Sequence, residues 1–343
     1  MTTGGPVNER DIRLICPHEH LLVDLSHEAV LPKNDGERAV FDGEVGGEAL
    51  ELLRRNPYVV RSNLILDSED LAVRETEPLK KFGCNLLVDV TSVGLGRDIR
   101  RIHDIARKSG IHVTAGCGFF VRDSLPDEYL EWDAGKICDY IMREINSGID
   151  GTNIKPGVIG EIGVSENIHP FERQSLEGAA SAAAQSGLPL YLHIYPWSHS
   201  GLEAVRILLE NGAEPGRICV CHLDVSFDLP YILRILETGV YVEFDNFGKE
   251  FYFEPQEGSF AGGPFETDIS RVRMLKHLCG LGFASRLLPA NDVCLKALLR
   301  RYGGNGYCHV FENIRPMLES ENIEKKYINL MFEQNPRRFL FGE

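Results

Sequence analysis

The stretch LPLYLHIYPWSHSGLEAVRILLENGAEPGRICVCHLD at residues 188–224 decides the fold class. It begins with a short apolar run, Leu188–Ile194, continues through an amphipathic segment, Gly201–Asn211, and ends with a second apolar run, Ile218–Cys221. Short runs rich in Val, Ile and Leu are typical of strands in a parallel sheet that is covered on both faces. The stretch therefore predicts a strand, a helix and a second strand parallel to the first.

The same alternation of apolar and amphipathic segments runs through nearly the whole chain of 343 residues. The other apolar runs are Ile12–Cys16, Asn85–Val90, Ile111–Ala115, Val158–Ile162, Val240–Phe244 and Arg286–Pro289. The other segments with helical periodicity are Glu69–Lys80, Asp98–Ser109, Ala134–Ser147, Glu172–Ser186, Leu229–Glu237 and Asp268–Leu281. Eight strands that alternate with helices predict a (β/α)8 barrel, and an open doubly wound sheet is the alternative on pattern alone. A last helix is predicted to end at Asn335.

Two segments are longer than the connections of a minimal barrel. Residues 27–68 extend the link after the first strand, and residues 246–267, NFGKEFYFEPQEGSFAGGPFET, form a long loop rich in glycine and aromatic residues. Long loops in compact domains usually carry function. Because no low-complexity linker divides the chain, we predict one barrel domain over residues 1–343, with both segments beside its active site.

The composition limits the classes of partner. A formal net charge of −15 at pH 7 disfavours nucleic acid and anionic membrane surfaces and leaves a small molecule as the expected partner. Nine scattered cysteines, an odd number, indicate reduced thiols and a cytoplasmic location. The N-terminus is polar and no apolar run reaches about 18 residues, so we expect no signal peptide and no membrane span.

Two histidines, His18 and His20, flank Glu19 at the end of the first predicted strand. Since alternate residues of a strand point to the same side, both imidazoles can converge on one ion. Such a pair is weak evidence alone, because histidines at this spacing also occur by chance.

Residues of metal-ligand type recur at the ends of four further predicted strands. These residues are Glu161, His193, His222 and Asp292. The C-terminal strand ends of α/β barrels build the active site, so all six side chains are expected on one rim. Four histidines and two acids suit two divalent ions that share a bridging carboxylate and a bridging water. Zinc is the expected metal, and Mn, Fe, Co or Ni are also compatible with these ligands.

Motifs of other chemistries are missing from the sequence. It contains no GxSxG elbow, no P-loop and no GxGxxG after the first strand. The segment GLGRD at residues 94–98 opens a predicted helix, and we interpret it as a tight turn with a helix cap.

The chain resembles the phosphotriesterase family of the amidohydrolase superfamily, especially its phosphotriesterase-related branch. The motifs that carry the resemblance are CPHEHLLVDL, DVTSVGLGRD, AGCGFFV, GIDGTNIKPGVIGEIGVS, LYLHIYP, NDVCLKALLRRYGGNGYCHVFENI and NPRRFL. The resemblance covers nearly the whole chain and implies a (β/α)8 barrel with a binuclear metal centre.

The resemblance also implies how the residues divide between two ions. His18, His20 and Asp292 would hold the buried ion, and His193 and His222 the more exposed one. Many members bridge the ions with a carbamylated lysine, whereas Glu161 occupies that position here, as in the phosphotriesterase-related branch. Glutamate is shorter, so the substrate of lysine-bearing members does not transfer directly to this chain.

These observations favour hydrolysis by a hydroxide that bridges the metal ions, with Asp292 as the catalytic acid–base. A small carboxylic ester or lactone is the first expected substrate, an N-acyl amide is close behind, and phosphotriesterase activity is a further alternative. A non-catalytic small-molecule-binding protein is the rival from another class. A homodimer is compatible with the resemblance.

Several side chains near strand ends are candidates for substrate contact. The expected substrate-binding residues are Phe119, Phe120, Tyr195 and Lys249. Further aromatic candidates for the pocket wall are Trp197, Phe247, Phe251 and Tyr252. Lys249 and Arg122 are the expected cations for an anionic substrate group.

Overall fold

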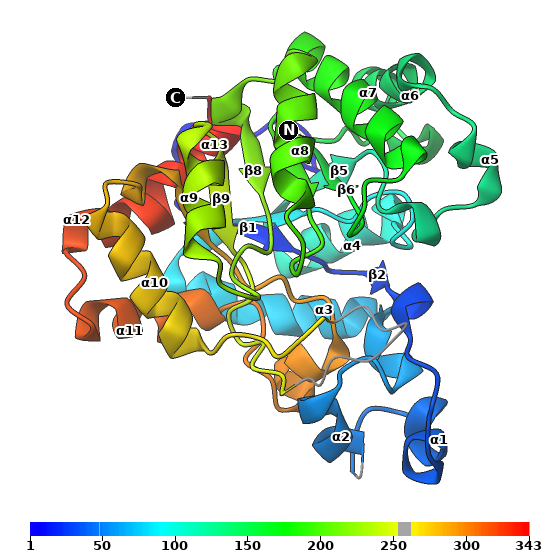
Figure 1. Ribbon diagram of the computed structural model, residues 1–343, viewed down its shortest axis with the longest axis vertical. Helices are drawn as coiled ribbons and strands as arrows, with labels where there is room; N and C mark the ends of the chain where they lie inside the picture. Colours follow the sequence, from blue (N-terminus) through cyan, green and yellow to red (C-terminus); the bar gives the residue numbers. More distant parts are fainter. Residues whose placement is uncertain (48, 253–261, 343) are drawn as a thin grey trace.

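The computed structural model describes residues 1–47, 49–252 and 262–342, and it contains eight parallel strands surrounded by helices (Figure 1). The strands, in order around the sheet, are β1 (Leu14–Glu19), β4 (Cys84–Asp89), β5 (His112–Cys117), β6 (Val158–Gly163), β7 (Leu190–His193), β8 (Ile218–Val220), β9 (Tyr241–Phe244) and β10 (Leu287–Pro289). Beyond the strand ends, Asp292 N donates to His18 O at 3.3 Å, which brings the last strand against the first. The predicted (β/α)8 barrel is confirmed over an open sheet.

The predicted helices are present, with ends that differ from the prediction by about two residues, as helix ends commonly do. They are α3 (Glu69–Thr76), α4 (Ile99–Ser109), α6 (Ala134–Ser147), α7 (Pro170–Ser186), α8 (Ser200–Glu210), α9 (Leu229–Glu237) and α10 (Asp268–Gly280). The first of them continues as 3-10 turns over Glu77–Phe82. Asp98 caps α4 by accepting from Arg101 N, which confirms the turn-and-cap interpretation of GLGRD. None of the helices in the described ranges is long and apolar enough to cross a membrane.

Alternation along the strands divides the apolar side chains into two layers. The layer inside the barrel contains Ile15, Leu86, Val88, Tyr191, Cys219, Cys221, Tyr241 and Leu288. The layer outside, which packs against the helices, includes Leu87, Leu190, Leu192, Val220 and Val242. Phe339 closes the N-terminal end of the barrel, with its ring centre 5.0 Å from that of Tyr191 and 5.3 Å from that of Tyr241. All nine cysteines are free thiols, so none is used to hold the fold.

The prediction that a last helix ends at Asn335 is wrong. Helices α11 (Arg315–Ser320) and α12 (Lys325–Asn329) are followed by a π-helical turn at Leu330–Gln334, and α13 (Asn335–Phe341) continues directly from it. An Asn before a Pro is an ordinary stop signal, but Pro336 stands in the first turn of α13, where its missing N–H costs nothing. Asn335 is buried and donates to Ala284 O and Leu287 O, both at 2.8 Å.

The extra segment after the first strand forms a lobe beside the C-terminal end of the barrel. It contains α1 (Asp35–Phe41) and α2 (Ala49–Arg55), and β2 (Val23–Asp24) pairs with β3 (Ile65–Leu66) at its base (Figure 1). A small apolar cluster of its own supports it: Val45, Ala49, Leu53, Val59 and Val60. Tyr252 N donates to Arg54 O at 3.1 Å, so the long loop after β9 meets this lobe. Residues 253–261 of the predicted loop 246–267 lie outside the described residues.

Candidate metal centre

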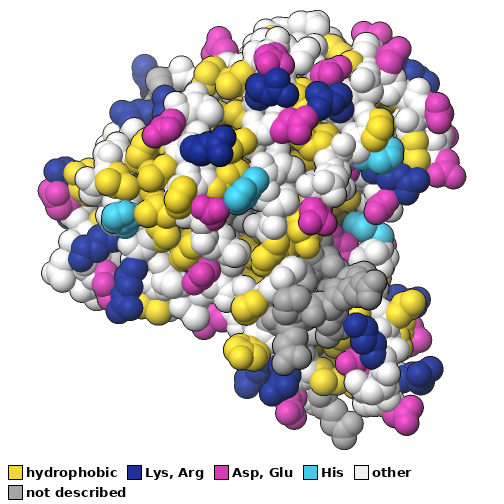
Figure 2. Space-filling model, in the orientation of Figure 1, with side chains coloured by type: hydrophobic (Ala, Val, Ile, Leu, Met, Phe, Trp, Pro, Cys, Tyr) yellow, Lys and Arg dark blue, Asp and Glu magenta, His cyan; other side chains and the backbone are white. Residues whose placement is uncertain are grey.

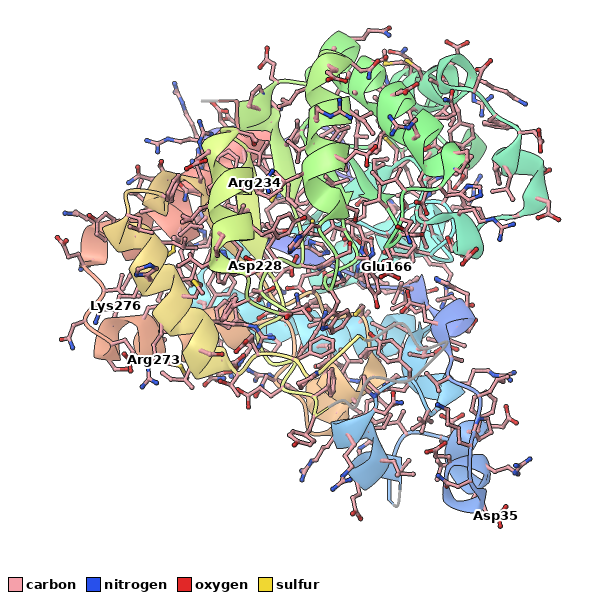
Figure 3. The ribbon with its side chains drawn as sticks, in the orientation of Figure 1. Asp35, Glu166, Asp228, Arg234, Arg273 and Lys276 are labelled. Atoms are coloured by element: carbon pink, nitrogen blue, oxygen red, sulfur yellow. The ribbon has the colours of Figure 1, made fainter. Side chains whose placement is uncertain are left out.

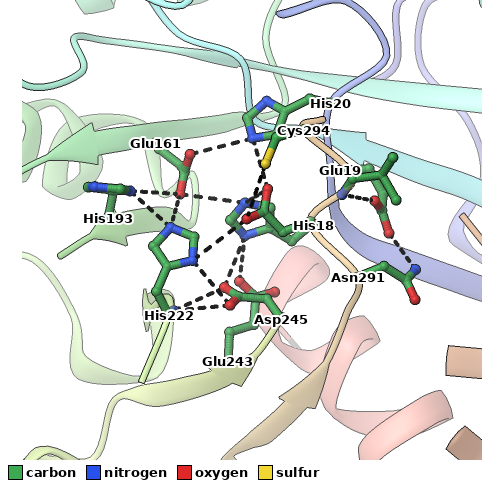
Figure 4. Close-up of polar contacts among 12 residues, drawn as sticks. His18, Glu19, His20, Glu161, His193, His222, Glu243, Asp245, Asn291 and Cys294 are labelled. Atoms are coloured by element: carbon green, nitrogen blue, oxygen red, sulfur yellow. Dashed lines mark hydrogen bonds and ion pairs between the residues drawn. The ribbon is translucent and has the colours of Figure 1, made fainter. Parts of the chain in front are cut away.

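The structure brings the six residues of metal-ligand type together at the C-terminal ends of five strands, and Figure 4 labels all of them except Asp292. They are His18, His20, Glu161, His193, His222 and Asp292, and all six are buried. His18 lies in β1, Glu161 in β6 and His193 in β7, whereas His20, His222 and Asp292 directly follow β1, β8 and β10. The strand ends therefore supply imidazoles and carboxylates to one small volume above the apolar interior.

One group of three side chains has the geometry of a metal site. The Nε2 atoms of His18 and His20 lie 3.6 Å and 3.2 Å from Asp292 Oδ1. Among the described residues, neither His18 Nε2 nor Asp292 Oδ1 has a hydrogen-bond partner, although both are buried. A buried polar atom without a partner is unfavourable by about 1–3 kcal/mol, and a divalent ion between these atoms would satisfy both. The three residues thus fit an ion.

Glu161 lies between this group and a second one. Its Oε1 is 3.0 Å from His222 Nε2 and 3.7 Å from His193 Nδ1, and its Oε2 is 3.7 Å from His20 Nε2. Burial alone would raise the pKa of Glu161, but the imidazoles of His18, His193 and His222 hold it well below its usual range. The carboxylate therefore stays ionised. Its oxygens contact imidazoles of both groups, since Oε1 also lies 3.5 Å from His18 Nε2, and a bridging ligand requires such a placement.

Three polar side chains that the sequence analysis did not single out orient the histidines. Glu243 Oε2 lies 2.8 Å from His18 Nδ1, and Asp245 Oδ1 lies 3.1 Å from His222 Nδ1. Thr91 Oγ1 donates to Leu22 O and lies 2.8 Å from His20 Nδ1, so it accepts from that nitrogen. Each contact suits an imidazole that carries its proton on Nδ1, which would leave the lone pair of Nε2 facing the centre.

The signal for two of these residues was present in the sequence. Glu243 and Asp245 alternate in the run YVEFD of β9, as the two histidines do after β1, so both can point into the barrel. This strand supplies none of the six predicted ligands, so neither residue was a predicted site residue. Carboxylates that orient metal-binding histidines follow the same alternation.

Glu243→Gln and Asp245→Asn are each expected to weaken zinc binding by about 10–100-fold, because an amide no longer fixes the proton on Nδ1. Competition with a chromophoric chelator measures this affinity. Glu210→Gln is the matched control, since Glu210 lies at the surface and pairs with Arg206 at 3.3 Å. Wild-type affinity in both buried variants would contradict the orienting role.

The backbone around the ligands is held in unusual conformations. His222 and Asp292 have φ angles of 62° and 45°, in the left-handed region that non-glycine residues adopt rarely and often at functional sites. Glu19, between the first two histidines, accepts from Asn291 Nδ2 at 2.6 Å and from Val293 N at 2.8 Å. Glu19 therefore fastens the end of β1 to the turn that carries Asp292, and it helps to hold the ligands in register.

A cavity of about 60 Å³ is lined by five of the six residues, all except His18. Its apolar wall includes Leu25, Tyr58, Leu95, Phe120, Val225, Phe251, Phe265 and Leu295. Phe120 packs edge-on against His193, with ring centres 4.5 Å apart. Lys249 also lines the cavity; it is buried, and its ammonium is ion-paired with Asp292 Oδ2.

The structure separates the predicted substrate-binding residues. Phe120 and Lys249 line this cavity, and Tyr195 lines a groove that adjoins it. Phe119 lines neither hollow, so the expectation that it contacts substrate is wrong. Its ring is fully buried and packs against an aromatic cluster on the helix side of β5. Consecutive residues after a strand face opposite sides, so Phe119 and Phe120 could not both reach the cavity.

The other aromatic and basic candidates also divide. Phe251 lines the cavity, whereas Phe247 is buried in the core and Tyr252 is 71% exposed. Trp197 packs against Phe265, with ring centres 5.6 Å apart. Arg122 is ion-paired with Asp123 at 2.8 Å on the surface and lines neither the cavity nor the groove.

Comparisons with known proteins agree with this geometry. The family model described as "Phosphotriesterase family" matches residues 1–340. A Tetraodon nigroviridis protein named N-acetyltaurine hydrolase is 32% identical over 342 residues, which cover 99% of this chain and 97% of that protein. The crystal structure of a resiniferatoxin-binding protein from Rhodobacter sphaeroides has a TM-score of 0.95 and 31% identity, covering 99% and 94% of the two chains. That of a phosphotriesterase homology protein from Escherichia coli has a TM-score of 0.79 and 26% identity, covering 96% and 99%.

Proposed function

Because the chain belongs to the phosphotriesterase family and is therefore a hydrolase, we propose that it hydrolyses the amide bond of a small N-acyl compound at a centre of two divalent ions. The observation that carries the proposal is that two buried, converging atoms, His18 Nε2 and Asp292 Oδ1, make no hydrogen bond within the described residues, beside an ionised carboxylate, Glu161. An amide is placed before an ester or lactone because the similar Tetraodon protein is named for hydrolysis of an N-acetyl amide. Ester, lactone and phosphotriester hydrolysis are the alternatives.

The distances between the side chains divide the proposed ligands between two ions. His18, His20 and Asp292 would hold one ion, His193 and His222 the other, and Glu161 both. Divalent ions bound there, zinc in the first place, would supply Lewis acidity and lower the pKa of a water molecule.

The two oxygens of Asp292 have different surroundings, and we assign them different roles. Oδ1 faces His18 and His20, as a ligand atom should, whereas Oδ2 meets the ammonium of Lys249. Because Oδ1 would be occupied as a ligand atom, we assign the proton of the attacking water to Oδ2, and the Lys249 ammonium lowers the pKa of Asp292 and so keeps the carboxylate in the ionised form that can accept it. When the amide bond breaks, the nitrogen leaves as an amine and needs a proton. The Asp292 carboxylate returns that proton, and Lys249 fixes the orientation of the carboxylate.

The proposed reaction predicts a substrate order. After metal removal and reloading with zinc, short N-acetyl amides are expected to be hydrolysed at least about tenfold faster, as kcat/KM, than γ-lactones, simple esters or organophosphates. Turnover of lactones but not amides would contradict amide hydrolysis and favour ester or lactone hydrolysis as the function. Full metal loading with no turnover of any of these compounds would favour a small-molecule-binding protein.

A further inference from the structure

A second hollow adjoins the cavity at the metal centre and differs from it in charge. It has a volume of about 310 Å³ and shares Glu28 and His193 with the first cavity. We call it the acidic groove, because Glu28, Asp123 and Glu166 line it together with His27, and no lysine or arginine does among the described residues. Glu166 lies on the loop after β6 at the open end of the barrel (Figure 3).

The basic residues near both hollows already have acidic partners. The Lys249 ammonium is bound by Asp292, and the Arg122 guanidinium by Asp123. Within the described ranges, Glu166 has no ion pair, and Glu28 approaches only one basic nitrogen within 4.0 Å, His27 Nε2 at 3.7 Å. Figure 2 shows acidic and histidine side chains side by side where the barrel meets the lobe of α1 and α2. The groove thus offers carboxyl groups to a ligand, whereas Lys249 and Arg122 are already paired.

Glu28 is the most informative of these acids because it is nearly buried. Its side chain is 11% exposed, and its carboxylate accepts no hydrogen bond from the part of the chain that the structure describes. Burial raises the pKa of Glu28 to about 8, so near pH 7 the group is largely protonated, and a cation bound beside it would favour its ionised form. A desolvated carboxyl group without donors is unfavourable, so this side chain suits a ligand that brings N–H donors and positive charge.

The two hollows meet at His193, which would hold the more exposed ion. The inner cavity has an apolar wall that includes Leu95, Phe251 and Phe265, and it suits the acyl chain of an amide. The acidic groove leads away from the same histidine and suits the amine side of the bond. The substrate of the proposed reaction would therefore lie with its two ends in surroundings of opposite character.

We propose that the amine half of the substrate carries a second, positively charged nitrogen, which binds Glu28 and Glu166 in the acidic groove. This inference rests on the proposed function for the position of the amide bond. It assigns to this chain an N-acyl diamine in preference to an N-acyl amino sulfonate such as N-acetyltaurine. Glu28 and Glu166 are then specificity-determining residues. The net charge of −15 would also steer such a cation toward the protein.

Three matched amides test the preference: N-acetyl-1,4-diaminobutane, N-acetylbutylamine and N-acetyltaurine, at equal zinc loading. The cationic amide is expected to exceed the neutral one by about tenfold in kcat/KM, and the anionic amide to be the poorest. Glu28→Gln and Glu166→Gln should each reduce the cationic-to-neutral ratio several-fold, and 0.5 M salt should reduce it as well. Glu210→Gln, on the exposed face of α8, should leave the ratio unchanged.

A binding measurement makes the inference independent of turnover. Calorimetry should show 1,4-diaminobutane binding to the zinc-loaded protein more tightly than taurine, with the difference reduced in Glu28→Gln. Equal or tighter binding of taurine, or a ratio that neither variant changes, would overturn the inference. Diamine binding that depends on Glu28, without hydrolysis of any amide, would contradict only the proposed function. Efficient hydrolysis with a preference for N-acetyltaurine would contradict only this inference.

Discussion

Replacing Asp292 with Asn is expected to lower kcat by about 10²–10⁴-fold, the range that general acid–base catalysis contributes, with little change in KM. Asn keeps an oxygen where Oδ1 faces His18 and His20, so an ion can still bind. The amide nitrogen of Asn would take the place of Oδ2, and it cannot accept a proton. Its N–H groups would also face the Lys249 ammonium, so donor would meet donor. Steady-state kinetics on the best amide measures the effect.

Metal content must be measured on the same samples, so that loss of an ion is not read as loss of the proton carrier. Asp104→Asn is a matched control, because Asp104 is half-exposed on α4 and pairs with Arg107 at 3.5 Å, away from the metal centre. A fully loaded Asp292→Asn protein with wild-type kcat would show that another group moves the proton.

Replacing Glu161 with Gln is expected to reduce bound metal from about two ions to about one and to lower kcat/KM by at least about 10²-fold, the upper end of what loss of an orienting partner does. Both oxygens of Glu161 face imidazoles, Oε1 toward His222 and Oε2 toward His20, and Gln offers one oxygen and no charge. Elemental analysis and kinetics after reloading with zinc measure the two quantities.

Reconstitution of the wild-type protein in buffer purged of carbon dioxide is the control for this role. Recovery should be complete without bicarbonate, because the Glu161 carboxylate needs no modification. Lys155, the lysine that precedes β6, could not supply a carbamate to the centre. It lies at the opposite end of the barrel, in a hollow that it shares with the N-terminal residues and His103. Recovery that requires bicarbonate, or two ions retained in Glu161→Gln, would contradict a bridging glutamate.

The strands and most helices could be predicted because their signals are local. Strands buried on both faces are short apolar runs, and the helices between them begin at residues such as Asp98 and Asp228, whose side chains cap them. The six residues of metal-ligand type were found for the same reason: each stands at a strand end, and in a barrel all strand ends meet on one rim.

The features that sequence reasoning missed depend on contacts between distant segments. The continuation of the last helix through Asn335 depends on acceptors at Ala284 and Leu287, about fifty positions away in the chain. Whether Phe119 or Phe120 faces the cavity depends on where β5 stops alternating. From the sequence, Lys249 was expected to bind an anionic substrate group. The fold shows that its ammonium is instead paired with Asp292.

Substrate specificity shows the same limit. Glu28 lies in a segment with no periodic signal, and its place beside His193 follows from how residues 27–68 fold back over the strand ends. A carboxyl group in an extra loop is usually solvated, so the sequence alone gives no reason to single it out. Its burial, and the absence of donors around it in the described structure, supply that reason.

The measurement that tests the central claim most directly is a titration of metal-free protein with zinc, followed by both elemental analysis and amide hydrolysis. Six converging ligands, with Glu161 between two groups, predict that activity rises until about two ions are bound per chain and that chelation abolishes it. Maximal activity at one bound ion or fewer would contradict the binuclear centre.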